Sequence, residues 1–581
     1  MTETIAGASI IVDIDEASLI DDPSFIEDPN LVAKASVITD ITLLKPDLAI
    51  NFGEITVPTT FPNEQGTVKV VVTNQGIAQF KEPLDINLYA STDPVLNKPL
   101  NTLNFPLEGT DELLGTRKLK NVNFKLGQSK TFTLDFANSN FRTASVVAPG
   151  SYYLIAEVVP SKTIAESNQT NNLASTHIST NGSDAVIDWN ATLLNAIQAS
   201  GQGGLPGTPP PLAARNQAIV HAAIYDAVNA IDRSHSSYLV DVDLSEVEDA
   251  SPEAAAVGAA YEALLKLYPT QKTTFDAQRD RSLAEIADGE AKEVGFALGV
   301  SVADQILELR STDGADTAQR PYTPGTEPGH WEPTPPNYAP ALLPGWGEVI
   351  PFAISSSSEF LLDGPPEFGS DEYAEELNEV KALGAKNSTV RTAEQTQIAQ
   401  FWAYDRPDTF RPPGQWNQIA EEVALKQGNT LEENARLFAL LNIAEADAGI
   451  TAWDAKYTYD QLRPITAIRN ADNDGNPDTT GDPNWEPLLT TPPFPDYISG
   501  HSTFGGAAGE ILARFFGDNT SFSVTSQELP GVTRSYGSFT QAADENGISR
   551  IYGGIHTHSA NEDGLATGRN VANYVFEHIL V

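Results

Sequence analysis

The sequence predicts a multidomain protein in which an immunoglobulin-like β-sandwich precedes a large, mainly α-helical domain. The chain has 581 residues, which is enough for several domains. Apolar residues alternate with polar ones between about residues 45 and 180, and then recur with a helical period. The first 44 residues are acidic and contain only scattered apolar residues. We therefore expect an N-terminal extension (1–44), a sandwich (45–180) and a helical domain (181–581).

The predicted sandwich contains several short segments rich in β-branched and aromatic residues. They include "GTVKVVVTNQG", "LDINLYASTD", "QSKTFTLDFA" and "GSYYLIAEVVP", and Gly, Asn and Pro lie between them. Short strands with turn residues at this spacing are typical of a β-sandwich.

The predicted helical domain contains long segments with a period of 3.6 residues. Examples are "ARNQAIVHAAIYDAVNAI", "EAAAVGAAYEALLKLY", "LAEIADGEAKEVGFALGVSVADQILEL" and "TLEENARLFALLNIAEADAGITAWDAKY". Proline-rich loops such as "LPGTPPPLAA" separate them.

The charge balance and the missing cysteines exclude several function classes. The chain has 35 basic and 78 acidic residues, so its formal net charge is −43, a field that repels nucleic acid and anionic membranes. There is no cysteine, which excludes disulfides, thiolate metal sites and cysteine nucleophiles. No stretch of about 18 apolar residues occurs, so we expect no membrane span. Any site for an anion must collect basic residues locally, against the overall field.

The stretch "WDAKYTYDQLRPITAI" supplies two such basic residues. Lys456 and Arg463 lie seven positions apart, which is about two helical turns, so we expect both on one helix face. Pro464 disfavours helical backbone at Arg463, which places that residue at the end of the helix.

Two further stretches add hydrogen-bond donors and histidines. In "FPDYISGHSTFGG", Ser499 offers a hydroxyl, Gly500 offers an accessible backbone N–H, and His501 follows at the start of a predicted helix. In "SRIYGGIHTHSANEDG", Arg550 and His556 flank a glycine pair that allows a tight turn. These groups suit a phosphate-sized oxyanion, with one histidine bonding to its central atom and the other moving protons.

The pattern Lys-x6-Arg-Pro, Ser-Gly-His and Ser-Arg-x5-His resembles the signature shared by vanadium-dependent haloperoxidases and type-2 phosphatidic acid phosphatases. The motifs that match lie within residues 450–565, and the helical pattern of residues 185–581 resembles the family more generally. The helical span and "TPPFPDYISGHSTFGGA" are more similar to the haloperoxidases, so we expect a helical bundle of haloperoxidase type.

The resemblance implies vanadate as the cofactor, with phosphate as an alternative occupant. It implies that the vanadate oxygens are held by Lys456, Arg463, Arg550, Ser499 and the Gly500 N–H. It further implies that His556 bonds vanadium through a ring nitrogen, that His501 is the acid–base group, and that Lys456 polarises the bound peroxide. Trp453 and Phe494 match aromatic residues of the halide pocket, although plain core packing explains them equally well.

Three features depart from the family or stand outside it. Ser502 follows His501 where a small apolar residue is usual, and a hydroxyl there is expected to shift the pKa of His501. His558 is additional, and we interpret it as a helix-start or pocket-rim residue. Acidic and amide side chains at alternate positions resemble half of a calcium loop, although a solvated acidic turn explains them better; they are Asp472, Asp474, Asn476 and Asp478.

The sandwich resembles the cell-adhesion-related (CARDB) domain of bacterial surface proteins. The matching pieces are "VTNQG", "LYASTD", "GSYYLIAEVVP" and "ESNQTNN". We interpret this domain as a spacer rather than a dedicated ligand site.

Three functions are compatible with these observations. The first is a vanadate-dependent haloperoxidase that oxidises bromide, with chloride or iodide as alternatives, and that uses hydrogen peroxide and a small organic acceptor. The second is an acid phosphatase with His556 as nucleophile, and the third is a non-catalytic adhesion or matrix protein. The acidity and the adhesion-like domain favour an extracellular or cell-surface location, although no signal peptide is recognisable. A homo-oligomer stays open.

Overall fold

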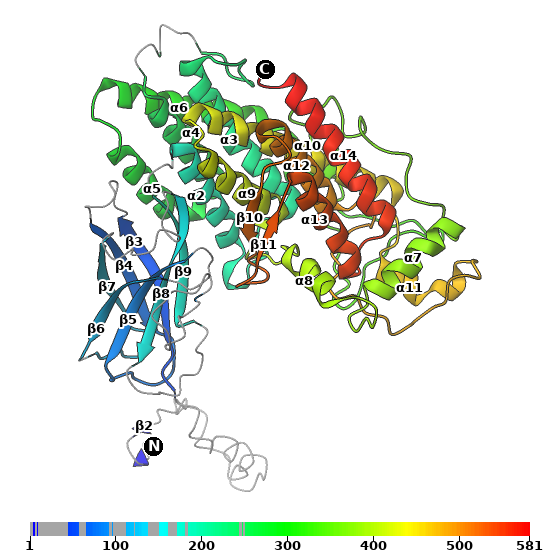
Figure 1. Cartoon of the computed structure of the whole chain (residues 1–581), viewed down its shortest axis with the longest axis horizontal. Helices are drawn as coiled ribbons and strands as arrows, with labels where there is room; N and C mark the ends of the chain where they lie inside the picture. Colours follow the sequence, from blue (N-terminus) through cyan, green and yellow to red (C-terminus); the bar gives the residue numbers. More distant parts are fainter. Residues whose placement is uncertain are drawn as a thin grey trace, which may run out of the picture.

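The computed structural model describes residues 4–5, 8–9, 45–56, 65–91, 96, 112–120, 122–137, 150–160, 171–180, 184–242, 247 and 250–581. The predicted extension (1–44) lies outside these residues except for β1 (Thr4–Ile5) and β2 (Ala8–Ser9), which pair antiparallel. A strand-rich N-terminal part is followed by a mainly helical part, which confirms the predicted fold class (Figure 1).

The strands between residues 48 and 180 form two antiparallel sheets. One has the order β3-β4-β7 and the other β6-β5-β8-β9. Their bounds are β3 (Leu48–Thr56), β4 (Gln65–Asn74), β5 (Leu84–Ser91), β6 (Glu112–Leu119), β7 (Ser129–Ala137), β8 (Gly150–Pro160) and β9 (Leu173–Thr180).

The alternation seen in the sequence builds the core of the sandwich. Val68, Val70 and Val72 of β4 are fully buried, while Lys69 between them is exposed. Leu84, Ile86 and Leu88 of β5 in the other sheet are buried in the same way and belong to the same apolar cluster. Each sheet therefore buries one face against the other, as a period of two requires.

In the rest of the described chain, α-helices and long loops are joined by one small hairpin, β10 (Phe522–Thr525) with β11 (Thr533–Tyr536). The α-helices are α2 (Ala185–Ser200), α3 (Pro210–Asp232), α4 (Pro252–Leu267), α5 (Lys272–Ala284), α6 (Glu290–Arg310), α7 (Asp371–Leu383), α8 (Ala393–Phe401), α9 (Arg411–Gln427), α10 (Leu431–Tyr459), α11 (Pro464–Arg469), α12 (Gly500–Phe516), α13 (Phe539–Gly553) and α14 (His558–His578).

The helix predicted over "LAEIADGEAKEVGFALGVSVADQILEL" is in fact two helices. α5 ends at Ala284 and α6 begins at Glu290. Gly289 between them has φ = 151°, a backbone conformation that residues with a side chain rarely adopt. This glycine therefore marks the start of α6, a boundary that hydrophobic periodicity alone does not show.

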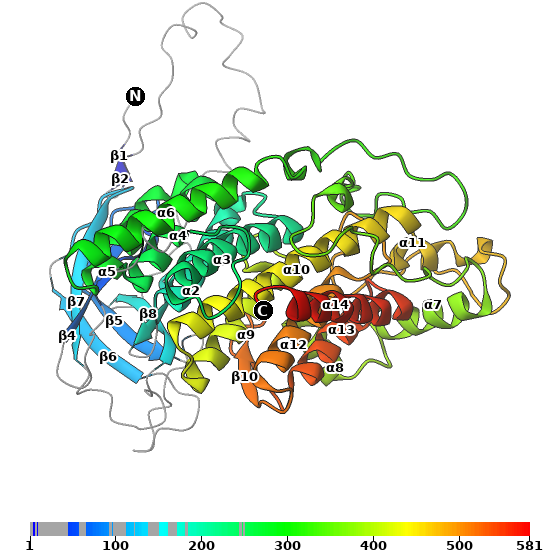
Figure 2. The ribbon, with the colours of Figure 1, turned by 90° about the horizontal axis from the view of Figure 1, so that it is seen from above.

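Helix α10 lies at the centre of the helical part and packs against α3 on one side and α12 on the other (Figures 1 and 2). α12 and α14 approach closely because glycines face the partner helix. A Cβ atom at Gly506 would overlap the carbonyl of Leu565, and one at Gly568 would overlap the carbonyl of Thr503. The small residues that follow Thr503 in the sequence therefore hold α12 directly against α14.

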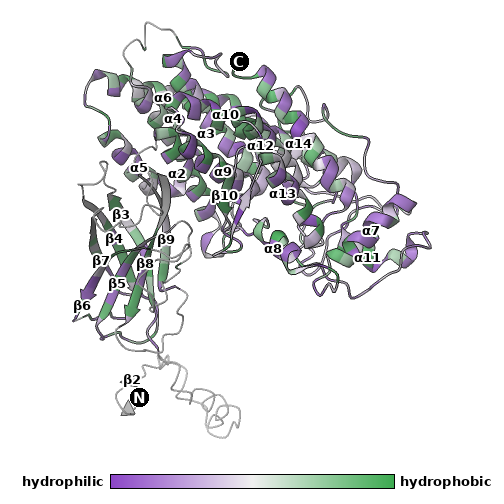
Figure 3. Cartoon of the chain, in the orientation of Figure 1, coloured by the Kyte–Doolittle hydropathy of each residue, from purple (hydrophilic) through white to green (hydrophobic). Residues whose placement is uncertain are grey.

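The sandwich lies beside α2 and α5, at the opposite end of the molecule from α7 and α11 (Figures 1 and 2). β9 ends at Thr180 and α2 begins at Ala185. Hydrophilic and hydrophobic residues alternate along the helices, as expected when one face of each is buried (Figure 3). None of the helices in the described part has the length and apolar character needed to cross a bilayer.

Candidate functional site

The predicted basic residues, the serine and one histidine come together between α10, α12, α13 and α14. Lys456 lies in the last turn of α10, Arg550 lies in the last turn of α13, and Ser499 caps the start of α12. Arg463 immediately precedes α11, and His556 lies between α13 and α14. The exposed fraction of each residue is 1% or less, so all five are buried.

The predicted shared helix face of Lys456 and Arg463 is wrong. α10 ends at Tyr459, and Asp460 adopts a left-handed conformation with φ = 51°. Arg463 is extended, with φ = −73° and ψ = 148°, and Pro464 begins α11. Proline thus excludes Arg463 from the helix, as expected, but the two cations meet because the chain turns between two helices.

Lys456 is held by backbone carbonyls at the start of the Ser-Gly-His loop. Its Nζ donates to the carbonyls of Pro495 (3.0 Å) and Asp496 (2.9 Å), which leaves one of its three N–H bonds for a ligand. Burial lowers the pKa of Lys456 well below its ordinary value, and the nearby charge of Arg463 lowers it further. A bound anion would favour the charged form of this lysine.

In each of the two arginines, some guanidinium nitrogens have hydrogen-bond partners and one buried nitrogen has none among the described residues. Arg463 donates from Nε to the Phe494 carbonyl and from Nη1 to the Ile555 carbonyl, both at 2.6 Å. Arg550 donates from Nη2 to Oδ2 of Asp405 at 2.6 Å. Nη2 of Arg463 and Nε of Arg550 are buried and have no partner among the described residues. Burial lowers the pKa of Arg463 to about 10.

These unused donors fit a tetrahedral oxyanion. A buried N–H group without a partner costs about 1–3 kcal/mol, and more when the group is charged. Lys456, Arg463 and Arg550 each have a donor left over, and donors of this kind form strong hydrogen bonds to an anionic acceptor. An anion with several oxygens would satisfy these groups together.

Ser499 caps α12 and shares a hydrogen bond with Ser502. Its Oγ accepts from the backbone N–H of Ser502 (3.3 Å) and lies 2.8 Å from Oγ of Ser502. Oγ of Ser502 also lies 2.8 Å from Oδ1 of Asn561. The expectation that Ser502 acts on His501 is therefore wrong, because its hydroxyl contacts Ser499 and Asn561.

Gly500 begins α12, so its N–H has no acceptor within the helix. A Cβ at this position would lie 3.3 Å from the Trp453 ring, so the glycine leaves room for that ring. The Trp453 and Phe494 rings lie 5.1 Å apart, and Nζ of Lys456 lies 4.9 Å from the Phe494 ring centre. Both predicted pocket aromatics thus border the cationic group, by which we mean Lys456, Arg463 and Arg550. Both rings are also buried in an apolar cluster.

His501 lies in the first turn of α12 with its ring held by a backbone carbonyl. Nε2 lies 2.8 Å from the Ala403 carbonyl, which can only accept, so Nε2 carries the ring hydrogen and Nδ1 has a lone pair. Burial, and then the charge of Arg550, lower the pKa of His501 to about 3. The ring is therefore neutral at pH 7 and able to accept a proton.

His556 has cationic and anionic neighbours on opposite ring nitrogens. Nε2 lies 3.2 Å from Nη1 of Arg463, and Nδ1 lies 2.6 Å from Oδ1 of Asp496. The latter contact is not an aligned hydrogen bond, and it is an ion pair only when the ring is protonated. Burial, and then Arg463 and Lys456, lower the pKa of His556 well below its ordinary value.

Two carboxylates of the site were missed by sequence reasoning. Asp405 precedes α9 and pairs with Arg550 across 145 residues, and no local pattern announces it. Burial raises the pKa of Asp405, but Arg550 and His501 outweigh burial, so the net pKa is lowered. Asp496 stands within "FPDYISGHSTFGG" as the acidic residue in an aromatic and apolar stretch, and this contrast was the available signal.

The calcium candidates use their oxygens within their own loop. Asp474 accepts from the Asn476 N–H and the Thr479 hydroxyl, and Asp472 accepts from the Gly481 N–H. Within the described ranges, no group of three or more His, Asp or Glu side chains is arranged to hold a metal. Calcium binding there stays a prediction.

His558 does not belong to the cationic group. It is the first residue of α14, its side chain is exposed, and Nδ1 lies 3.1 Å from Oε2 of Glu379. The interpretation of His558 as a helix-start residue agrees with this position.

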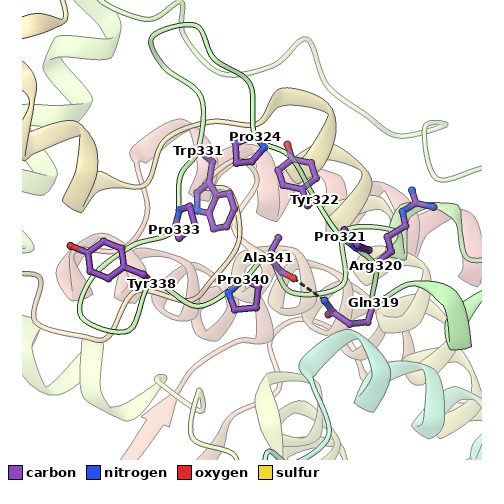
Figure 4. Close-up of a pocket in the computed structure, with 10 residues that line it drawn as sticks. All are labelled: Gln319, Arg320, Pro321, Tyr322, Pro324, Trp331, Pro333, Tyr338, Pro340 and Ala341. Atoms are coloured by element: carbon purple, nitrogen blue, oxygen red, sulfur yellow. Dashed lines mark hydrogen bonds between the residues drawn. The ribbon is translucent and has the colours of Figure 1, made fainter.

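A surface hollow of about 660 Å³ lies in the loop that borders the aromatic pair (Figure 4). Tyr322, Trp331 and several prolines line it, together with Arg320 at its edge. None of its lining residues belongs to the cationic group. The loop reaches the site through Leu342, whose carbonyl accepts from the indole N–H of Trp453.

Comparisons with known families and proteins agree with this geometry. The family described as "VCPO second helical-bundle domain" matches residues 436–580, which contain the whole cationic group, and the CARDB family matches residues 45–176. Vanadium chloroperoxidase of Curvularia inaequalis is 30% identical over 479 residues, which cover 64% of this chain and 78% of that protein.

Solved structures lead to the same group. A bacterial vanadium-dependent iodoperoxidase is 31% identical, with a TM-score of 0.60 over 68% of this chain and 97% of that chain. A holo-type bacterial vanadium-dependent chloroperoxidase shares the fold, with 17% identity and a TM-score of 0.54 over 68% of this chain and 97% of that chain. The buried cationic group of Lys456, Arg463 and Arg550 (hereafter the oxyanion cradle, after the ligand we propose for it), the matched helical domain and these relatives together lead to one conclusion: the chain belongs to the vanadium-dependent haloperoxidase family and has a CARDB domain ahead of its helical domain.

Proposed function

We propose that this protein is a vanadate-dependent haloperoxidase that oxidises a halide with hydrogen peroxide to hypohalous acid. One observation carries the proposal. Three buried cationic side chains, Lys456, Arg463 and Arg550, keep donors without protein partners beside the buried ring of His556. In a chain with a net charge of −43, this local concentration of positive charge is suited to an oxyanion.

The residues present fit vanadate. Arg463, Arg550 and Lys456 would neutralise its oxygens, and His556 would bond to vanadium through Nε2. The Ser499 hydroxyl and the Gly500 N–H would complete the set of donors. When bound, vanadate supplies a Lewis-acidic centre that activates hydrogen peroxide toward a halide.

His501 would accept and return a proton at Nδ1 during the reaction. Its Nε2–H is fixed on the Ala403 carbonyl, so the ring cannot turn without losing that hydrogen bond. Its pKa is lowered to about 3 by burial and by Arg550, and negative charge on a ligand beside Nδ1 would raise it toward the operating pH.

We propose bromide as the preferred halide, with chloride and iodide as alternatives. The related proteins named above include both chloroperoxidases and an iodoperoxidase, so the names alone do not choose. The aromatic rings of Trp453 and Phe494 border Lys456 and would form the wall that a halide meets. The natural organic acceptor stays a prediction.

Phosphatase activity is the second candidate. Phosphate is also a tetrahedral oxyanion, and the Nε2 lone pair of His556 faces the cationic group as a nucleophile would. The third alternative, a non-catalytic protein, leaves the unused buried donors without a purpose.

One assay separates these candidates. The purified protein, stripped of anions, is tested for monochlorodimedone halogenation with peroxide and each halide, with and without vanadate. We expect activity that depends on vanadate, that disappears in His556→Ala and that survives in His558→Ala. His558 is the matched control because it is a nearby histidine that is exposed and paired with Glu379 instead.

No vanadate-dependent activity with any halide would overturn the proposal. Hydrolysis of a phosphate monoester that is lost in His556→Ala, without halogenation, would establish the phosphatase instead. The non-catalytic alternative requires the wild type and both variants to be silent in both assays.

A further inference from the structure

Asp496 is a fully buried carboxylate that contacts His556 on the ring nitrogen opposite the one that faces Arg463. Its Oδ1 lies 2.6 Å from Nδ1 of His556 and 3.6 Å from Nη1 of Arg463. Its Oδ2 accepts from the backbone N–H and the hydroxyl of Thr557, at 3.2 and 3.1 Å. Its backbone carbonyl accepts from Nζ of Lys456 at 2.9 Å. One residue thus contacts the histidine, the arginine and the lysine of the oxyanion cradle.

The contacts of His556 determine which nitrogen carries its hydrogen. Nε2 lies 3.2 Å from Nη1 of Arg463, and a guanidinium can only donate, so Nε2 must be the acceptor. The hydrogen of the neutral ring is therefore on Nδ1, the atom that faces Asp496. Nδ1 and Oδ1 have no hydrogen-bond partner elsewhere among the described residues, which leaves each available to the other.

A carboxylate at this depth needs compensation. Removing a charge from water costs several kcal/mol unless opposite charges and hydrogen bonds replace the water. Thr557 supplies two hydrogen bonds to Oδ2, whereas in the described part of the chain Oδ1 contacts only the His556 ring and, at a longer distance, Arg463. The Thr557 contacts attach the start of α14 to Asp496. They do not explain why Oδ1 of Asp496 points at the His556 ring.

We propose that Asp496 is a positioning residue that holds the hydrogen of His556 on Nδ1 and keeps the Nε2 lone pair aimed into the oxyanion cradle. Histidines that bind metals commonly donate their second N–H to such a carboxylate, which fixes both tautomer and ring orientation. The backbone carbonyl of the same residue orients Lys456. This inference rests on the proposed vanadate site, and it adds a residue whose side chain touches neither substrate nor cofactor.

The first test measures vanadate binding by isothermal titration calorimetry, with no turnover involved. We expect Asp496→Asn, which keeps the shape but not the charge, to weaken vanadate binding about tenfold. We expect Asp496→Ala to weaken it up to about a hundredfold, the range found for the supporting partners of metal ligands. Thr557→Val removes the hydroxyl contact to Oδ2 but leaves Oδ1, so it should bind vanadate within about twofold of the wild type.

The matched control for folding is Asp447→Asn. Asp447 is also fully buried, and its carboxylate accepts three backbone N–H bonds from Phe352, Ala353 and Ile354, remote from the oxyanion cradle. This variant should lose thermal stability and keep its vanadate affinity. Equal affinity in Asp496→Asn, Asp496→Ala and the wild type would overturn the proposal, as would an equal loss in Asp447→Asn.

A second measurement needs no variant of Asp496 and no vanadate. The ¹⁵N chemical shifts of the histidine rings, assigned to His556 by comparison with His556→Ala, report which nitrogen is protonated. We expect the Nδ1–H tautomer in the vanadate-free wild type, and a dominant Nε2–H tautomer would overturn the inference. A wild type that has this tautomer but binds no vanadate would contradict the proposed function and leave the assignment of Asp496 to His556 intact.

Discussion

Two of the buried polar clusters in the described part of the helical domain differ in charge, and we propose that one of them binds an anion. The bundle cluster joins α2, α3, α9 and α10 and consists of Asn190, His221, Asn417, Glu421, Asn442 and Glu445. Its hydrogen bonds form two neighbouring sets, one of Asn190 with His221 and Glu421 and one of Asn417 with Asn442 and Glu445. The oxyanion cradle is equally buried, but it contains Lys456, Arg463 and Arg550.

Two histidines, one in the bundle cluster and one beside the oxyanion cradle, show how the two environments differ in their effect on a pKa. The pKa of His221 and that of His501 are both lowered to about 3. For His221 the cause is burial alone, and its ring stacks on Phe438. For His501 the charge of Arg550 adds to burial, so an anion that neutralises Arg550 would release part of the shift. Burial makes a histidine neutral, whereas neighbouring charges make its protonation depend on a ligand.

The largest expected effect separates these two histidines. His501→Ala should lower the rate of halide oxidation by a factor of about 10² to 10⁴, because a general acid–base group is lost. Vanadate affinity should change by only a few-fold, because His501 is not among the cationic groups. Steady-state kinetics and calorimetry measure the two quantities. His221→Gln should lower stability and leave the rate per folded molecule unchanged; an equal loss of rate would break the comparison.

The next effect concerns the cations themselves. Arg463→Met should weaken vanadate binding by about a hundredfold, since it removes the buried charge whose Nη2 has no protein partner. Titration calorimetry on protein whose circular dichroism matches the wild type measures this effect. Glu445→Gln in the bundle cluster is the control and should bind vanadate like the wild type. Unchanged affinity in Arg463→Met would show that the cradle is not the anion site.

The bundle cluster should be visible in the pH dependence of stability. Burial raises the pKa of Glu445 well above 4.5, so the folded protein holds a proton there that the unfolded chain releases. Its contribution to stability is therefore greatest below pH 4.5 and is lost as the pH rises toward the folded-state pKa. The slope is at most about 1.4 kcal/mol per pH unit.

Denaturant unfolding between pH 4.5 and 7 tests this sign. Glu445→Gln should flatten the decline that the wild type shows, because the amide is neutral at every pH. A variant that declines as steeply as the wild type would show that Glu445 is ionised in the folded protein.

The smallest expected effect is that of Ser502→Ala. The Ser502 hydroxyl contacts Oγ of Ser499 at 2.8 Å and not His501, so its loss should weaken vanadate binding by only a few-fold. The pH dependence of halide oxidation should not move. A shifted pH profile would restore the sequence-based expectation that Ser502 tunes His501.

Local residue patterns predicted the elements around the site correctly, whereas the spacing of its residues along the chain did not predict how they meet. The helix predicted after the Ser-Gly-His stretch is present as α12, and the structure adds that Ser499 is its N-cap and that it begins at Gly500. The spacing of Lys456 and Arg463 misled, because the left-handed Asp460 and Pro464 interrupt the helix between them. The two alternating sheets and most of the long helices were likewise readable, since burial repeats with the period of each element.

By itself, the sequence determined the order of sandwich and helical domain, the local excess of positive charge near the C-terminus, and the residues that signal the family. Only the tertiary structure decided which carboxylates accompany those cations. Asp405 pairs with Arg550 across 145 residues, and Asp496, which precedes α12, contacts His556 between α13 and α14. The physical reason is that a buried charge is stabilised by whatever lies within a few ångströms, and chain folding, not sequence distance, sets those neighbours.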